Sequence, residues 1–340
     1  MAINKERLIK LTESFLGKRL RTDHSIICAY LTGSMLSEDP FINGTADVDI
    51  VMVHNHSPAA VREIVPLSAE VTLDIHHLDQ AYFSPSKKVR KDPWVGSSLC
   101  FDPVVLYGAG HWFEFAQASV EANFFAPEYV MYRSRLFSNE ARTLLSSLGA
   151  IAANGTSAYC SAYLKIVENS CNAIACLSKM PLTDRVMMRQ FKPLAETVGA
   201  ADLTADLYDL MLGQTDPSLY YEYFFNSWQY YLTYFGNSPF SNQKMQSSRL
   251  PYYTAAVSAY WNEHLISSLW IMAKTWSSVA RALQLDGNEY YEALCTMLEI
   301  HPRSCPQRSS QLEAFLEKVE EVQAAWGAEQ GFDEREQTLL

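Results

Sequence analysis

The pattern of apolar residues changes once along this chain, near residue 114, and that change limits the possible folds more than any other feature. Before it, short runs rich in Val and Ile predict buried strands at residues 25–31, 47–53, 70–76 and 103–108. After it, helical spacing predicts helices at 128–148, 157–179, 184–197, 202–212, 217–235, 254–284, 288–299 and 310–326. The sequence therefore predicts an α/β (α+β) domain with a small mixed sheet, followed by an all-helical bundle.

The same change in pattern sets the expected domains. We expect one domain over residues 1–113, a helical domain over 114–328 and a flexible, polar tail over 329–340. The length of 340 residues suits two domains of ordinary size. Within the first domain we expect an opening helix at 4–16 that ends at Gly17, and a short helix at 59–65.

The charge balance argues against nucleic acid as a partner. Lys and Arg number 27 against 38 Asp and Glu, so the net charge of −11 would be repelled by a phosphate backbone. An odd number of cysteines, 7, with no C-x-x-C pair indicates reduced thiols and no structural zinc. The N-terminus shows no signal-peptide pattern, and the longest uncharged run, 143–164, is too polar to span a bilayer. We therefore expect a cytoplasmic protein without membrane contact, either a monomer or a homodimer.

Three acidic residues lie on predicted strands. Asp47 and Asp49 are two apart, so their side chains leave one face of the strand with Cα atoms ~7 Å apart. Their repulsion would be relieved by divalent cations, and two such ions ~4 Å apart can clamp the oxygens of a phosphoryl transfer. Asp74 supplies a third carboxylate if the two strands are neighbours. The sequence thus predicts a site for a pair of divalent cations.

A glycine and a serine follow the first predicted strand. Gly33 would let backbone amides approach and cradle a phosphate, with the Ser34 hydroxyl as an extra donor. Taken alone, Gly33 would be a turn glycine and Ser34 a helix cap, so their meaning depends on the acids that follow.

The ordered set of Leu31-Thr32-Gly33-Ser34, Asp47-Val48-Asp49-Ile50 and Leu73-Asp74-Ile75 resembles the nucleotidyltransferase superfamily typified by DNA polymerase beta. Residues 102–108, followed by helices, look like the small bacterial aminoglycoside-type enzymes of that superfamily, some of which confer antibiotic resistance. The resemblance implies Mg²⁺-dependent transfer of a nucleoside monophosphate from a nucleoside triphosphate, ATP by preference, to an acceptor hydroxyl. It also implies that Asp47, Asp49 and Asp74 are catalytic, and that Gly33 and Ser34 hold the triphosphate.

The sequence departs from that family pattern in two places. Thr45-Ala46 stands where a Ser often precedes the first Asp, after a long spacer. The third acid is also ambiguous, because Glu70 lies on the same strand face as Asp74 and in a context similar to streptomycin-modifying relatives. Their Cα atoms differ by ~13 Å along the strand, so only one can complete the site. We prefer Asp74.

Several basic residues and histidines compete for roles around this site. Relatives often carry a triphosphate-binding basic residue where Arg185 stands, and Lys179 and Lys192 compete for that role. The run 87–91 is basic and could steer a triphosphate, although a solvated loop is the simpler interpretation. We interpret His76 and His77 as a strand exit, and His54 and His56 as solvated loop residues.

The acceptor is the least determined part of the sequence. The acidic helical domain suits a cationic small molecule such as an aminoglycoside. Core packing explains most aromatics of 220–235, and Tyr221, Tyr223 and Tyr230 are the candidates to line an acceptor pocket. The alternative is a protein-modifying or non-catalytic nucleotide-binding member of a toxin–antitoxin-type system. No Arg followed after four to six residues by His occurs beyond residue 114, which argues against a ribonuclease of that type.

Overall fold

The computed structural model of this chain describes residues 4–332 and forms two compact units. The first, which we call the sheet unit, runs to Phe125 and also includes Asn242–Ala255; the second, the helical unit, includes Ala126–Ser241 and the residues from Ala256 onward. The expected boundary after residue 113 falls inside the helix α4 (Trp112–Phe124), which packs on helices of the sheet unit. The expected tail at 329–340 lies outside the described residues from 333 onward.

The sheet has five strands in the order β3-β4-β2-β1-β5. They are β1 (Ile26–Thr32), β2 (Ala46–His54), β3 (Arg62–Pro66), β4 (Val71–Asp79) and β5 (Val104–Gly108). The pair β2–β4 is parallel and the other pairs are antiparallel, so the predicted small mixed sheet is confirmed. The prediction of a short helix at 59–65 is wrong, because residues 62–66 form β3. The backbone N–H and C=O groups of β3 are hydrogen-bonded to β4.

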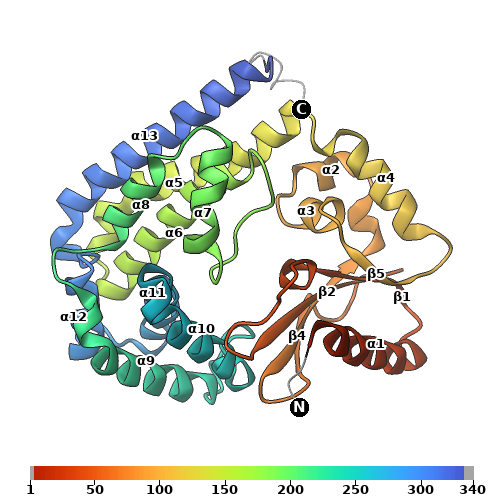
Figure 1. Cartoon of the computed structure of the whole chain (residues 1–340), viewed down its shortest axis with the longest axis horizontal. Coiled ribbons are helices and arrows are strands. Elements are labelled where there is room, and N and C mark those ends of the chain that lie inside the picture. The colour runs from red at the N-terminus through yellow and green to blue at the C-terminus, as the bar shows by residue number, and fades with distance from the viewer. Residues whose placement is uncertain (1–3, 333–340) are drawn as a thin grey trace. The chain divides into compact units, whose positions relative to one another are not determined.

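One face of the sheet is covered by α1 (Lys5–Thr22) (Figure 1). Leu8 and Leu16 of this helix share a buried core with Val48 and Ile50 of β2. The predicted stop at Gly17 is wrong: Gly17 is exposed, and the helix continues because Leu20 still packs against this core. The helix ends where Asp23 adopts extended backbone.

The other face of the sheet is covered by three helices that the sequence pattern did not reveal (Figure 1). They are α2 (Ser86–Lys91), α3 (Val95–Cys100) and α4. Their residues Val89, Leu99 and Phe124 form a second core with Tyr30 and Val51 of the sheet. Alternate residues of β2 therefore enter two different cores, which fixes the direction of every side chain on that strand.

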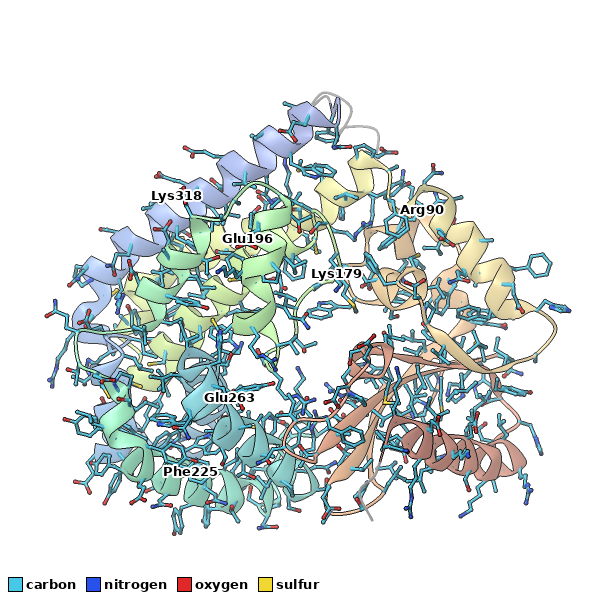
Figure 2. The ribbon with its side chains drawn as sticks, in the orientation of Figure 1. Arg90, Lys179, Glu196, Phe225, Glu263 and Lys318 are labelled. Atoms are coloured by element: carbon cyan, nitrogen blue, oxygen red, sulfur yellow. The ribbon has the colours of Figure 1, made fainter. Side chains whose placement is uncertain are left out.

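The helical unit confirms the helical half of the prediction. It consists of α5 (Pro127–Ala152), α6 (Thr156–Ala175), α7 (Met187–Thr197), α8 (Leu203–Met211), α9 (Tyr221–Gly236), α11 (Leu265–Leu283), α12 (Glu289–Met297) and α13 (Cys305–Glu329), and α10 (Leu250–Glu263) begins in the sheet unit. The helix predicted at 254–284 is two helices, because His264 leaves helical backbone. Lys318 on α13 pairs with Asp206 on α8 at 2.6 Å (Figure 2). None of the described helices has the length and apolar character to cross a membrane.

Candidate metal centre

The three predicted acids come together on the sheet. Parallel pairing of β2 with β4 sets Asp49 opposite Asp74 and Asp47 opposite Thr72. Asp47, Asp49 and Asp74 each offer one carboxylate oxygen, and these oxygens lie within 4.8 Å of one another. Three carboxylates at this separation can share a divalent cation with hard oxygen preference, such as Mg²⁺.

The acids lie on the sheet face opposite α1. Val48 and Ile50 pack in the core under α1, so alternation turns Asp47 and Asp49 to the other face. Asp47 is 3% exposed and Asp74 1%, whereas Asp49 is half-buried. Solvent therefore reaches the cluster at Asp49 rather than at the two flanking acids.

The turn after β1 approaches the acids directly. Gly33 has φ +64°, and a Cβ on it would lie 2.2 Å from Oδ2 of Asp49. The Ser34 hydroxyl donates to the backbone carbonyl of Asp47 at 3.0 Å. The structure thus places Gly33 and Ser34 beside the carboxylates, and the role of the two residues in triphosphate binding stays a prediction.

The fit between Gly33 and Asp49 gives a testable prediction. Gly33→Ala forces the new methyl group onto the Asp49 carboxylate, so we expect Mn²⁺ affinity, measured by titration of the free Mn²⁺ paramagnetic signal, to fall at least about 10-fold. Gly44→Ala is the matched control, because Gly44 has φ +76° but no atom of residues 4–332 lies within 4 Å of its Cβ position. Both variants carry a similar backbone strain of ~1 kcal/mol. Equal Mn²⁺ affinity in the two variants would contradict the prediction.

Two arginines that the sequence analysis missed bind the acids. Arg249 donates from Nη2 to Asp47 Oδ2 and from Nη1 to Asp74 Oδ2, each at 2.6 Å. Arg62 on β3 donates from Nε to Asp74 Oδ1 at 2.7 Å and also from Nη2 to the second oxygen. Arg249 is 175 residues from Asp74 along the chain, so no local pattern could have linked them. Arg62 would have been found only by predicting β3.

These ion pairs set the protonation of the site. Burial by itself raises the pKa of Asp74, but the hydrogen bonds from Arg62 and the charge of Arg249 outweigh it and leave the pKa below its usual value. Burial likewise disfavours charge on Arg249, yet Asp47 and Asp74 raise the pKa of the guanidinium overall. Asp74 and Arg249 are therefore both charged at neutral pH.

Glu70 is not part of the cluster. It precedes β4, its side chain accepts a hydrogen bond from Ser68 at 2.9 Å and is exposed, and its carbonyl accepts from the backbone of Ala46. Among the two acids that the sequence left open, Asp74 is the one that lies with Asp47 and Asp49.

Three of the basic residues that the sequence offered for a triphosphate belong to the helical unit. Arg185 is buried within the helical unit, where Lys192 pairs with Glu196 and Lys179 is exposed (Figure 2), so their role toward a triphosphate stays a prediction. The run 87–91 forms most of α2 rather than a solvated loop. Its Arg90 (Figure 2) donates to the backbone carbonyls of Ser119 and Val120 and so joins α2 to α4.

Two histidines form a buried network at the far end of β2 and β4. His54 and His77 are 3% and 8% exposed, and their rings are hydrogen-bonded at 2.9 Å. His54 also contacts the Ser25 hydroxyl at 2.8 Å, and His77 lies 3.4 Å from Glu63. The expectation that His54 is a solvated loop residue is wrong, because it is the last residue of β2 and pairs with both β1 and β4.

This pair predicts a pH dependence of stability. Burial lowers the pKa of His54 and of His77 below the usual value of about 6.5. As pH falls below 6.5 the unfolded chain therefore gains protons before the folded chain does, and the free energy of unfolding decreases by up to about 1.4 kcal/mol per histidine and pH unit. Urea unfolding at pH 7.5 and 5.5 measures this loss.

A double variant separates these histidines from the other titrating groups. We expect His54→Gln with His77→Gln to reduce the loss of stability between pH 7.5 and 5.5, whereas His24→Gln, at an exposed position, should leave it unchanged. An unchanged loss in the double variant would assign the pH dependence to other residues.

Comparison of the chain with protein-family models gives no match, and comparison with curated proteins gives none either. The class that the fold and the site define is an α/β protein whose mixed sheet carries a carboxylate cluster able to hold a divalent cation. Any narrower assignment depends on the geometry of these residues.

Proposed function

We propose that this chain is a Mg²⁺-dependent nucleotidyltransferase that moves a nucleoside monophosphate from a nucleoside triphosphate to a hydroxyl group of a small molecule. The observation that carries the proposal is the cluster of Asp47, Asp49 and Asp74 directly beside the Gly33 turn. The order of these residues along the chain resembles the nucleotidyltransferase superfamily typified by DNA polymerase beta, and their convergence on one sheet face is what that chemistry requires.

In the proposed reaction the acceptor oxygen bonds to the α-phosphorus, the bond from that phosphorus to the bridging oxygen breaks, and pyrophosphate leaves. Magnesium bound to the carboxylates would neutralise the charge that develops on the phosphate oxygens. Asp47 and Asp49 would hold the cations, and the Gly33 turn leaves room for the Asp49 carboxylate.

Asp74 has two possible roles toward the acceptor hydroxyl, orienting it or removing its proton, and the surroundings of Asp74 favour the first. A general base works best when its pKa is near the operating pH, whereas the two arginines lower the pKa of Asp74. We therefore assign Asp74 to orienting the acceptor hydroxyl and holding charge, and the hydroxyl proton to solvent water.

For the acceptor we propose only a chemical class. The excess of acidic residues suits a cationic small molecule, and an aminoglycoside-like antibiotic is the first candidate. A second candidate function is a nucleotide-binding domain that has lost turnover. The ion pairs of Arg249 with Asp47 and Asp74 favour it, because the guanidinium occupies the carboxylates that would hold the metal. Turnover distinguishes the two candidates.

Two linked experiments test the proposal. Mg²⁺ with ATP or another triphosphate should raise the melting temperature, because a ligand at 100 times its Kd adds ~2.7 kcal/mol to the free energy of unfolding. Labelled triphosphates are then incubated with Mg²⁺ and aminoglycosides, lincosamides or cell lysate, and the labelled fraction is identified. No thermal shift at millimolar triphosphate would contradict the proposed function, and a shift without label transfer would favour the non-catalytic candidate.

A further inference from the structure

The carboxylate cluster already holds a cation that the chain itself supplies. Arg249 ends the short helix η4 (Ser247–Arg249) and bridges Asp47 and Asp74 with its two terminal nitrogens, each at 2.6 Å. Arg249 is 5% exposed, so its guanidinium group is almost fully buried. One fork of donors thus binds two of the three proposed metal ligands at once.

The contacts of Arg249 are incomplete. Its Nε is buried and has no hydrogen-bond partner within residues 4–332, and a buried donor without an acceptor destabilises the folded chain. The guanidinium carbon lies 5.2 Å from the ring centre of Tyr252 and 6.0 Å from that of Tyr253. The side chain is therefore supported by aromatic rings while one donor remains available to a further acceptor.

Charge indicates what that acceptor is. Three carboxylates face the two guanidinium groups of Arg62 and Arg249, and His76 lies 3.7 Å from Asp74, so these groups together carry at most one net negative charge. Divalent cations alone would reverse that charge and be repelled by Arg249. A triphosphate brings about four negative charges, so cations and triphosphate together suit the same residues far better than cations alone.

We propose that Arg249 couples metal binding to triphosphate binding: it competes with the cation for Asp47 and Asp74, and on release its guanidinium binds the phosphate oxygens. Arg249 is then a triphosphate-binding residue, a role for which the sequence offered Arg185, Lys179 and Lys192. The inference rests on the proposed function and adds a rule to it, namely that the site binds metal tightly only together with its nucleotide.

The test measures Mn²⁺ affinity of the full chain with and without α,β-methylene-ATP, a triphosphate that cannot transfer its nucleotidyl group. In the native protein we expect this triphosphate to tighten Mn²⁺ binding at least about 10-fold, within the usual range of couplings between sites. In Arg249→Gln we expect Mn²⁺ alone to bind about 10-fold more tightly than in the native protein, and the gain from the triphosphate to fall at least about 10-fold. These two changes have opposite signs, which a general loss of structure would not produce.

Two further variants serve as a conservative substitution and a matched control. Arg249→Lys keeps the charge but cannot span Asp47 and Asp74 with one planar fork, so it should shift both quantities in the same directions by less. Arg19→Gln is the matched control: Arg19 belongs to the same unit and pairs with Glu63 at 2.6 Å, and its loss should leave both quantities unchanged. The lysine variant also serves if Arg249→Gln does not fold.

The outcomes separate this inference from the proposed function. Mn²⁺ bound equally by the native protein and the Arg249 variants would overturn the coupling and make Arg249 a purely structural ion-pair partner, with the nucleotidyltransferase proposal still standing. Mn²⁺ bound by none of these proteins, with or without the triphosphate, would overturn both.

Discussion

Asp49→Asn is expected to lower the rate of nucleotidyl transfer by at least about 10³-fold while the protein stays folded. The change removes one charged metal ligand without altering volume, and transition-state interactions through a metal are worth several kcal/mol. Asp49 is the best position for this test because it is half-buried, whereas Asp47 and Asp74 are 3% and 1% exposed. Initial rates with saturating Mg²⁺ and triphosphate measure the effect.

The control for this variant is Glu70→Gln, which removes an exposed carboxylate next to the same sheet. Its rate should stay within a few-fold of the native protein. Asp47→Asn should lose as much activity as Asp49→Asn but also some stability, because it deprives Arg249 of a buried partner. Full activity in Asp49→Asn would end the two-metal mechanism.

Asp74→Asn is expected to lower the rate by at least about 10²-fold, because the acceptor hydroxyl would no longer be held in position, with triphosphate binding largely retained. The structure adds a second effect. Asp74 accepts hydrogen bonds from both Arg62 and Arg249, so its neutral analogue leaves two buried or partly buried guanidinium groups short of a counter-charge. Breaking a buried ion pair typically costs about 3 to 5 kcal/mol, which urea unfolding would detect.

The comparison of Asp74→Asn with Glu70→Gln decides which acid completes the site in function. The geometry predicts a large loss of rate for the first and almost none for the second, because Glu70 lies outside the cluster. The reverse ranking would move the role to Glu70 and strengthen the likeness to streptomycin-modifying enzymes.

The positions of the acids could be predicted from the sequence because successive side chains of a strand point to opposite faces of the sheet. Val48 and Ile50 point into one core, so Asp47 and Asp49 must point to the other face, whatever lies beyond. The proximity of Asp74 required one more assumption, that its strand is a neighbour of β2, and the parallel pairing of β2 with β4 supports it.

Short elements left too little pattern to predict. The helices α2 and α3 have 6 residues each, fewer than two turns, and show no helical repeat of apolar residues. The segment 62–66 lacks a β-branched run as strong as its neighbours, and only its pairing with β4 makes it a strand. Tertiary contacts, rather than local preference, decide these segments.

The contribution of residues 242–255 to the sheet unit could not be predicted from the sequence, for a different reason. Arg249 lies in the predicted helical domain, between the helices expected at 217–235 and 254–284. In the structure Asn242–Ala255 belongs to the sheet unit, and Gln243 donates to the Arg62 carbonyl at 2.7 Å. No spacing or composition marks such a return. The ion pairs that neutralise Asp47 and Asp74 therefore emerge only from the folded chain.

The central claim is tested most directly by the position of the label that leaves the triphosphate. The native protein and Asp49→Asn are each incubated with Mg²⁺, an acceptor panel of aminoglycosides and cell lysate, and ATP labelled at either the α- or the γ-phosphate. We expect the α-label to appear on an acceptor, the γ-label to leave as pyrophosphate, and Asp49→Asn to transfer neither. Transfer of the γ-label to an acceptor, or equal α-transfer by Asp49→Asn, would contradict nucleotidyl transfer at this carboxylate cluster.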